Sequence, residues 1–344
     1  MKLYRHNAPL KLDLLLEQAL EKQVFDIQNE HDFEKTALSI FRYQASHNEV
    51  YKRYIDLLKV DIDAIQSIDK IPFLPISFFK QQKIVTGQFE PAILFTSSGT
   101  TGMVNSTHFV KDEQLYIKSF LHCFRQFYGN EKDFTFVCLL PSYLERTGSS
   151  LIYMMDYLVK ASGKAQSGFY PQLNDSFVNV IQSLQKNKTQ KVFFMGVTFA
   201  LLELAEKFPC DLSNFIIMET GGMKGRRKEI TRAELYETLQ QNLNAKAIHS
   251  EYGMTELLSQ AYSKENGQFY CPKHMKILIR DLNDPFTILA TNKTGVINVI
   301  DLANIYSCAF IATQDAGKML NNGSFEVLGR VDHSDVRGCN LLMG

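Results

Sequence analysis

The chain has 344 residues, of which 45% are hydrophobic, and its 37 basic residues balance 37 acidic ones. A chain of this length and composition can bury a large core, so we expect a globular protein of roughly two lobes. Because no block of like charge exceeds a few positions, the sequence favours neither nucleic acid nor an anionic membrane as a partner, and we expect a small-molecule or protein ligand.

The N-terminus and the longest apolar stretch argue against an export signal or a membrane span. Residues 1–23 combine acidic side chains with helical spacing, whereas a secretion signal needs an uninterrupted apolar core. Residues 192–205 are shorter than a bilayer span and are interrupted by Gly196 and Thr198, so no transmembrane segment is expected. The six cysteines show neither CxxC pairs nor zinc spacing, which favours a cytoplasmic protein with thiols such as Cys138 in the core.

Residues 1–80 are expected to be mainly helical, because their apolar residues recur at spacings of three and four. Helices are predicted within residues 13–23, 32–48 and 49–59. They are followed by "IPFLPISFFK" (71–80), where Pro72 and Pro75 forbid a helix and favour an extended segment that leads into the core.

From about residue 92, short apolar runs alternate with amphipathic stretches, which is the pattern of an α/β fold with parallel strands. Strands are predicted at 92–97, 134–140, 191–196, 214–220 and 245–251, and helices at 112–127, 149–161, 175–186, 198–207 and 228–242. Beyond residue 265 the runs are strand-rich, at 276–282, 286–290, 295–302, 307–313 and 324–330, with turn signals in "DAG" and "NNG". We therefore expect one large domain over 1–328, with a helical part (1–80), an α/β core (90–262) and a smaller β-rich lobe (265–328), and a short tail (329–344).

A loop rich in hydroxyls and glycine follows the first of these strands, in "FTSSGTTGMVNST" (95–107). Backbone amides next to glycine, together with serine and threonine hydroxyls, can wrap phosphate oxygens. The loop lacks the lysine of GxxxxGK[ST] and two of the glycines of GxGxxG. On composition alone, a phosphate site and a polar turn explain it equally well. Its candidate phosphate ligands are Ser97, Ser98, Gly99, Thr100, Thr101 and Gly102.

Three further motifs follow along the chain. "HSEYGMTELLS" (249–259) comes after a predicted strand, at an end where α/β sheets bind ligands, although Glu256 there could equally cap or solvate a following helix. "FIATQDAGK" contains Asp315, and "VLGRVDHSDVRGCNLL" contains Arg330 and Asp332. Together with "TSSGTTG", these motifs resemble the adenylate-forming superfamily of acyl-CoA synthetases and luciferase-like ligases. "IPFLPISFFK", "LLPSYLERTGSSLIYMM", "ETGGMKGRR" and "GRVDHSDVRGCNLL" are more similar to its acyl-protein synthetase (LuxE-type) branch, over nearly the whole chain.

The resemblance implies an α/β adenylate-forming domain that activates a small carboxylic acid with ATP and Mg²⁺. It implies that the loop closes over the β- and γ-phosphates, that Glu256 holds Mg²⁺ and that Thr255 contacts the α-phosphate. Asp315 would accept both ribose hydroxyls, and Arg330 would add a cation nearby. The adenine and acyl slots would be lined by Tyr252, Gly253, Thr220, Gly221 and Gly222.

The chain departs from the superfamily pattern after the last motif. Full-length adenylating enzymes continue with a mobile domain of roughly 100 residues that carries an adenylation lysine. Because 12 residues follow Asp332 in this sequence, we expect neither that domain nor that lysine. Members of the acyl-protein synthetase branch carry the acyl group on their own cysteine, and Cys339 in "RGCNLLMG" occupies the matching place. Arg337 would favour its thiolate. The alternative is that "CNLL" is a buried strand end.

Three functions are compatible with these residues. The leading hypothesis is a ligase that forms the adenylate of a carboxylic acid, expected to be a fatty acid, moves the acyl group to Cys339 and passes it to a protein partner. The second is an acyl-CoA or acyl-carrier ligase whose partner supplies the lysine, and the third is a non-catalytic scaffold that binds nucleotide or acyl groups. The 25 phenylalanines and 11 methionines suit an acyl tunnel and core packing equally well. Ser149 and Ser150 suit either the acyl end of the site or a helix cap.

Overall fold

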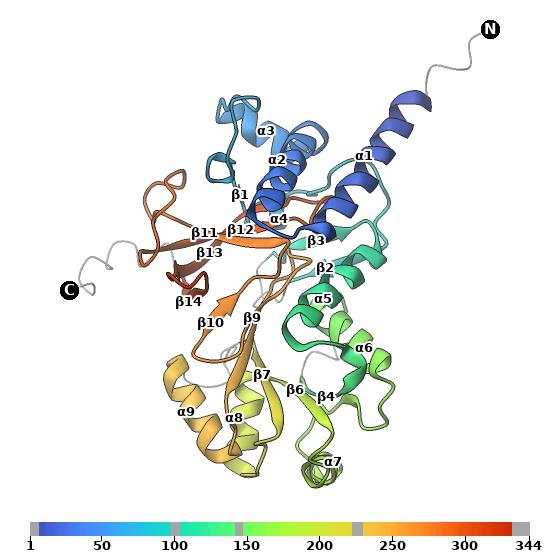
Figure 1. Ribbon diagram of the computed structural model, residues 1–344, viewed down its shortest axis with the longest axis vertical. Helices are drawn as coiled ribbons and strands as arrows, with labels where there is room; N and C mark the ends of the chain where they lie inside the picture. Colours follow the sequence, from blue (N-terminus) through green and yellow to red (C-terminus); the bar gives the residue numbers. More distant parts are fainter. Residues whose placement is uncertain (1–6, 98–103, 142–146, 222–229, 332–344) are drawn as a thin grey trace. The chain divides into compact units, whose positions relative to one another are not determined.

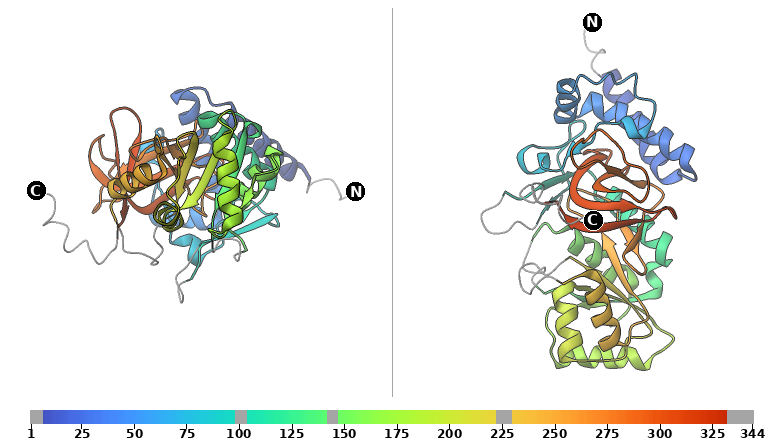
Figure 2. Two further views of the ribbon diagram at one scale, coloured as in Figure 1. Left: turned by 90° about the horizontal axis from the view of Figure 1, so that it is seen from below. Right: turned by 90° about the vertical axis from the view of Figure 1, so that its left-hand side faces the viewer.

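The computed structural model describes residues 7–97, 104–141, 147–221 and 230–331 (Figures 1 and 2). The chain divides into two compact units, each discontinuous in sequence. The terminal unit takes in the described residues of 1–119, 255–259 and 271–344, and the central unit those of 120–254 and 260–270. Helix α5 (Glu113–Tyr128) contains the first boundary between the units.

The terminal unit begins with the three predicted helices, α1 (Asn7–Asp26), α2 (Glu30–His47) and α3 (Glu49–Leu57). Asn48 ends α2 and caps α3, because its side-chain oxygen accepts the backbone N–H of Tyr51. Polar contacts hold α1 against the rest of the unit. Glu17 accepts hydrogen bonds from the Tyr43 hydroxyl and from Lys111 Nζ, both at 2.6 Å.

Antiparallel strands make up most of the remainder of the terminal unit. They run in the order β11 (Met275–Arg280), β12 (Thr294–Asp301), β13 (Phe310–Met319) and β14 (Phe325–Arg330). The short strand β1 (Leu74–Pro75) pairs in parallel with β13, which confirms the extended segment expected at the two prolines. A separate antiparallel pair is formed by β2 (Ile93–Thr96) and β3 (Thr107–Val110).

The central unit is built on a parallel sheet, as the sequence pattern predicts. Its parallel strands lie in the order β8 (Ile248–Tyr252), β7 (Phe215–Thr220), β6 (Lys191–Val197), β4 (Phe134–Leu139) and β5 (Gly168–Phe169). Strand β9 (Ala261–Ser263) adds to β8 in the antiparallel sense, and β10 (Gln268–Tyr270) pairs with β9. The helices of this unit are α6 (Ser150–Ser162), α7 (Asp175–Lys186), α8 (Thr198–Lys207) and α9 (Arg232–Leu243). Figure 2 shows α8 and α9 side by side.

Phenylalanine fills the cores of both units. In the central unit Phe124 packs its ring against those of Phe134, Phe136 and Phe193, at centroid distances of 5.3 to 5.7 Å. In the terminal unit the ring of Phe310 packs against those of Phe41, Tyr51 and Phe73. Core packing therefore accounts for much of the aromatic content of the chain.

Several local predictions are wrong. The strand predicted at 92–97 as part of the parallel pattern is β2, which instead pairs with β3 in the antiparallel sense. The helix considered as an alternative after Glu256 does not form; residues 257–260 are irregular and lead into β9. "DAG" (315–317) lies within β13, where a register shift between Ala316 and Gly317 gives the local irregularity that resembles a turn in the sequence. Residues 286–290 form only an isolated bridge between Ile288 and Arg280. The end of "IPFLPISFFK" is the short helix α4 (Phe78–Gln81), because its last residues lie beyond the influence of Pro75.

Candidate functional site

The ends of the hydroxyl-rich loop are joined to each other. Strands β2 and β3 are antiparallel neighbours, so the loop that connects them begins and ends at the same edge. The backbone N–H of Ser97 donates to the carbonyl of Ser106 at 3.0 Å, and the N–H of Ser106 donates to Ser97 Oγ at 2.8 Å. The other predicted phosphate ligands, Ser98 to Gly102, lie outside the described residues.

Glu256 lies in the same unit as this loop base and shares a partner with it. Its side chain is buried, and the Ser106 side chain interacts with it closely enough to lower the pKa of the carboxyl. Burial raises the pKa of the Glu256 carboxyl, while the Ser106 hydrogen bond and the positive charges of Arg330 and Lys80 lower it. One serine therefore joins the base of the loop to a desolvated carboxylate.

Asp301, at the end of β12, anchors the backbone around Glu256. Its fully buried carboxylate accepts the N–H groups of Leu258 at 2.8 Å and Ser259 at 3.0 Å, and the Ser259 hydroxyl at 2.5 Å. Asn304, also buried, donates from Nδ2 to the carbonyl of Glu256 at 2.9 Å. Because residues 255–259 have no regular secondary structure, these side chains satisfy backbone groups that a helix or sheet would otherwise satisfy.

His108, on β3, forms a hydrogen bond with Thr255, the residue that precedes Glu256. Its Nδ1 lies 2.9 Å from the carbonyl of Thr255, so this nitrogen carries the proton that it donates. Burial lowers the pKa of His108 to about 4. The imidazole is therefore neutral at physiological pH and positions Thr255 without adding charge.

Asp315 and Arg330 lie directly opposite each other on β13 and β14. Arg330 Nε is 3.8 Å from Asp315 Oδ1; the arginine side chain is largely exposed, whereas that of the aspartate is mostly buried. The predicted nucleotide-binding pair thus occupies adjacent register positions on two strands, with the guanidinium on the solvent side.

Three further predicted site residues, Thr220, Tyr252 and Gly253, lie in the central unit near Glu251, a residue that the sequence analysis did not single out. Thr220, at the end of β7, donates from Oγ1 to Glu251 Oε2 at 2.9 Å. A Cβ at Gly253 would lie 2.3 Å from Glu251 Oε1, so any larger residue there would require the Glu251 side chain to move. Tyr252 is buried and packs against the ring of Phe269. Burial is the main cause that raises the pKa of Glu251 to about 7.

A second carboxylate lies near the end of the neighbouring strand, β7. Glu219, on β7, accepts hydrogen bonds from the Thr198 hydroxyl and, at 3.0 Å, from the Ser250 hydroxyl. Burial raises the pKa of the Glu219 carboxyl, and its charge contributes to the raised pKa of Glu251. Gly221, two residues after Glu219, has φ +84°, a conformation that favours glycine. Gly222 and Cys339 lie outside the described residues.

The motif "EYGMTE" is divided between the two units. Tyr252 and Gly253 belong to the central unit, and Thr255 and Glu256 to the terminal unit. Sequence spacing did not indicate His108, Asp301 or Asn304, because each acts on the motif from a distant part of the chain.

Ser149 caps α6 by accepting the N–H of Ile152 at 3.3 Å, in line with the capping interpretation. Within the described residues, no helix is long and apolar enough to cross a membrane.

Comparisons with known proteins agree with the predicted resemblance. Residues 12–131 match the family model described as acyl-protein synthetase, LuxE. A curated relative, the long-chain-fatty-acid–luciferin-component ligase of Photorhabdus luminescens, is 41% identical over 70 residues, which make up 20% of this chain and 60% of the relative. The match therefore spans less than two thirds of that relative.

Solved structures show the fold. An open conformation of 2-hydroxyisobutyryl-CoA ligase, in complex with 2-HIB-AMP and CoA, has a TM-score of 0.63 at 12% identity and covers 90% of this chain and 72% of its own. ATP-bound MatB from Rhodopseudomonas palustris has a TM-score of 0.53 at 16% identity, over 80% of this chain and 52% of its own. O-succinylbenzoate coenzyme A synthetase from Bacillus subtilis, in complex with ATP and magnesium, has a TM-score of 0.50 at 19% identity, over 71% and 51%. The predicted fold class, the α/β domain of adenylate-forming enzymes, is confirmed.

Proposed function

We propose that this chain activates a carboxylic acid, most simply a fatty acid, as its acyl-adenylate and then transfers the acyl group to a thiol, that of Cys339. The observation that carries the proposal is the interaction of the Ser106 side chain with the buried Glu256 carboxyl, which lowers the pKa of that carboxyl. It joins the base of the loop proposed to hold the phosphates to the carboxylate proposed to hold a divalent cation. The matched family and the matched ligase from Photorhabdus luminescens support the same reaction class.

Adenylation replaces a poor leaving group by a good one. A carboxylate oxygen of the acid attacks the α-phosphorus of ATP, the bond from that phosphorus to the bridging oxygen breaks, and pyrophosphate leaves. Such a displacement needs positioning and charge neutralisation more than covalent help from the protein. Residues 97–102 would hold the β- and γ-phosphates, and Thr255, fixed by His108, would contact the α-phosphate.

Glu256 suits a magnesium ion in its chemistry and its environment. A carboxylate is a hard oxygen ligand of the kind Mg²⁺ prefers, and the desolvated Glu256 side chain gains from a nearby positive charge. When bound, the ion would neutralise phosphate charge. Asn304 and Asp301 hold the backbone that presents this carboxylate. Asp315 would accept the ribose hydroxyls, with Arg330 nearby. In the central unit Thr220, Gly221, Gly222, Tyr252 and Gly253 would line the adenine and acyl groups.

In the second step, the thiolate sulfur attacks the acyl carbon, the bond to the phosphate oxygen breaks, and AMP leaves a thioester behind. Burial raises the pKa of Cys210 to about 11 and those of Cys271 and Cys308 to about 12, and it raises that of Cys138 further. These thiols are poor nucleophiles at neutral pH. Cys123 is also buried, so among the cysteines of the chain this favours Cys339, from which a protein partner would take the acyl group. CoA is the second candidate acceptor, because one of the matched structures, that of 2-hydroxyisobutyryl-CoA ligase, is a complex with CoA.

The test is to incubate the protein with ATP, Mg²⁺ and a series of carboxylic acids, and to follow ATP–pyrophosphate exchange and intact mass. We expect acid-dependent exchange and a hydroxylamine-labile mass increase that Cys339→Ser abolishes while exchange persists. An adduct that survives Cys339→Ser would contradict the assignment of that cysteine. Exchange with a thioester formed only on added CoA would favour the CoA ligase. The absence of exchange with every acid would favour a binding scaffold.

A further inference from the structure

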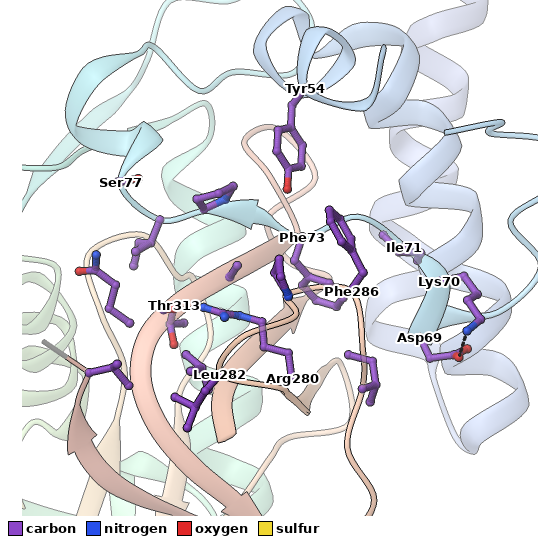
Figure 3. Close-up of a pocket in the computed structure, with 18 residues that line it drawn as sticks. Tyr54, Asp69, Lys70, Ile71, Phe73, Ser77, Arg280, Leu282, Phe286 and Thr313 are labelled. Atoms are coloured by element: carbon purple, nitrogen blue, oxygen red, sulfur yellow. Dashed lines mark hydrogen bonds and ion pairs between the residues drawn. The ribbon is translucent and has the colours of Figure 1, made fainter. Parts of the chain in front are cut away.

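The terminal unit contains a cavity of about 490 Å³ that is lined by none of the residues assigned above to adenylation. This volume lies in the range of small-molecule sites in proteins. Apolar and aromatic residues make up most of its lining, and the polar lining residues are Tyr54, Asp69, Lys70, Ser77, Arg280, Thr313 and Gln314 (Figure 3). The residues that define it are Tyr54, Phe73, Arg280, Leu282, Phe286 and Thr313.

Arg280 is the cation of this cavity. Its Nε donates to Asn298 Oδ1 at 3.1 Å and its Nη2 to the carbonyl of Thr313 at 3.0 Å, and these two bonds fix the plane of the guanidinium. No carboxylate among the described residues forms an ion pair with it. Partial burial lowers the pKa of Arg280, which shows that its charge is desolvated without full compensation. An anion bound beside it would supply that compensation.

Tyr54 places a hydroxyl in the same space. Figure 3 shows its oxygen directed into the cavity from α3. Burial raises the pKa of Tyr54, and the charge of Arg280 opposes that rise, so the two groups influence each other while the hydroxyl keeps its proton. No hydrogen bond joins this hydroxyl to another described residue. It is therefore a donor that a ligand can use.

We propose that this cavity binds a small carboxylic acid with an apolar body, as a site separate from the adenylation site. The guanidinium fork matches the two oxygens of a carboxylate, the Tyr54 hydroxyl adds a third donor, and the aromatic walls cover the apolar part. A single charge is favoured because Arg280 is the only cation among the lining residues without an acidic partner. The other, Lys70, lies 3.4 Å from Asp69. The proposal does not depend on acyl activation.

The absence of tryptophan from the chain allows a local test. Phe286 is 56% exposed, so Phe286→Trp is tolerated by packing and introduces the sole tryptophan on the cavity wall. Decanoate is titrated into this variant without ATP, with tryptophan fluorescence as the readout, and 1-decanol serves as a ligand of the same chain length without charge. We expect a saturable response to decanoate and a response at least about 10-fold weaker to decanol, the scale of losing a charged hydrogen bond.

Two further substitutions in that background test the donors. Arg280→Lys, which keeps the charge and loses the fork, should weaken decanoate binding about 10-fold, and Tyr54→Phe about threefold. Tyr270→Phe, in the central unit, is the matched control and should change nothing; thermal unfolding checks that each variant is folded. No saturable response, an equal response to decanol, or unchanged binding in both donor variants would overturn the proposal. Tighter binding of decyl phosphate than of decanoate would overturn the assignment of a single charge.

Discussion

Asp301→Asn perturbs the anchor beneath Glu256 without touching Glu256 itself. The carboxylate accepts two backbone N–H groups on Oδ2, and a hydroxyl and the N–H of Ala303 on Oδ1. Asparagine can accept on one side only and turns an NH₂ group toward the donors on the other. At least two buried donors lose their acceptor, at about 1.5 kcal/mol each, so the free energy of unfolding should fall by about 3 kcal/mol.

The assay combines urea unfolding with ATP–pyrophosphate exchange. Residues 255–259 lose their fixed position, so we expect exchange to fall together with stability, under conditions where the variant is still folded. Asp284→Asn is the matched control: Asp284 also accepts a backbone N–H, from Phe286, and a hydroxyl, from Thr287, but it is exposed. It should change the free energy of unfolding far less than Asp301→Asn does. Equal effects of the two substitutions would refute the reasoning.

Three other substitutions test separate parts of the structure. The pKa of Glu251 is raised from 4.5 to about 7, so between these pH values the folded state binds more protons than the unfolded state. The free energy of unfolding of the wild type should therefore fall as pH rises through that range, and Glu251→Gln should remove about 3 kcal/mol of this fall. Parallel pH profiles of the two proteins would contradict this prediction. Gly317→Ala should cost about 2 kcal/mol in urea unfolding, because a Cβ would lie 2.6 Å from Ile297, whereas Gly168→Ala, with 3.9 Å to its nearest neighbour, should cost less than about 1 kcal/mol. Lys111→Met should lower the free energy of unfolding by about 2 kcal/mol, because it removes the partner of the largely buried Glu17. Lys207→Met, which breaks an exposed pair with Glu203, should lower it by about 0.5 kcal/mol. A larger effect at Lys207 than at Lys111 would refute this prediction.

The repeating patterns were predictable because local spacing determines them. Four of the five parallel strands of the central unit, the helices between them and the N-terminal helices follow from apolar periodicity, whereas the two-residue β5 does not. The order of four short motifs indicated the fold. "DAG" was misread because glycine in a bulged strand and glycine in a turn look alike in one sequence.

The support of the candidate site was not predictable in the same way. Asp301 and Asn304 contact residues 255–259 from more than 40 positions away, and His108 reaches Thr255 across 147. Neither residue type nor spacing indicates such contacts. Glu251 stood inside a recognised motif, yet only the burial seen in the folded chain reveals its raised pKa. The proposed roles of Ser98 to Gly102, Gly222 and Cys339 rest on the motifs alone.

ATP–pyrophosphate exchange by Glu256→Gln tests the central claim most directly, because the substitution keeps the shape of the side chain and removes the charge proposed to hold the cation. With an acid that supports exchange by the wild type, we predict a loss of at least about 100-fold in a folded protein, the scale of removing one group that stabilises charge in a transition state. Glu203→Gln, on the exposed face of α8, should retain wild-type exchange. Wild-type exchange by Glu256→Gln would contradict the account.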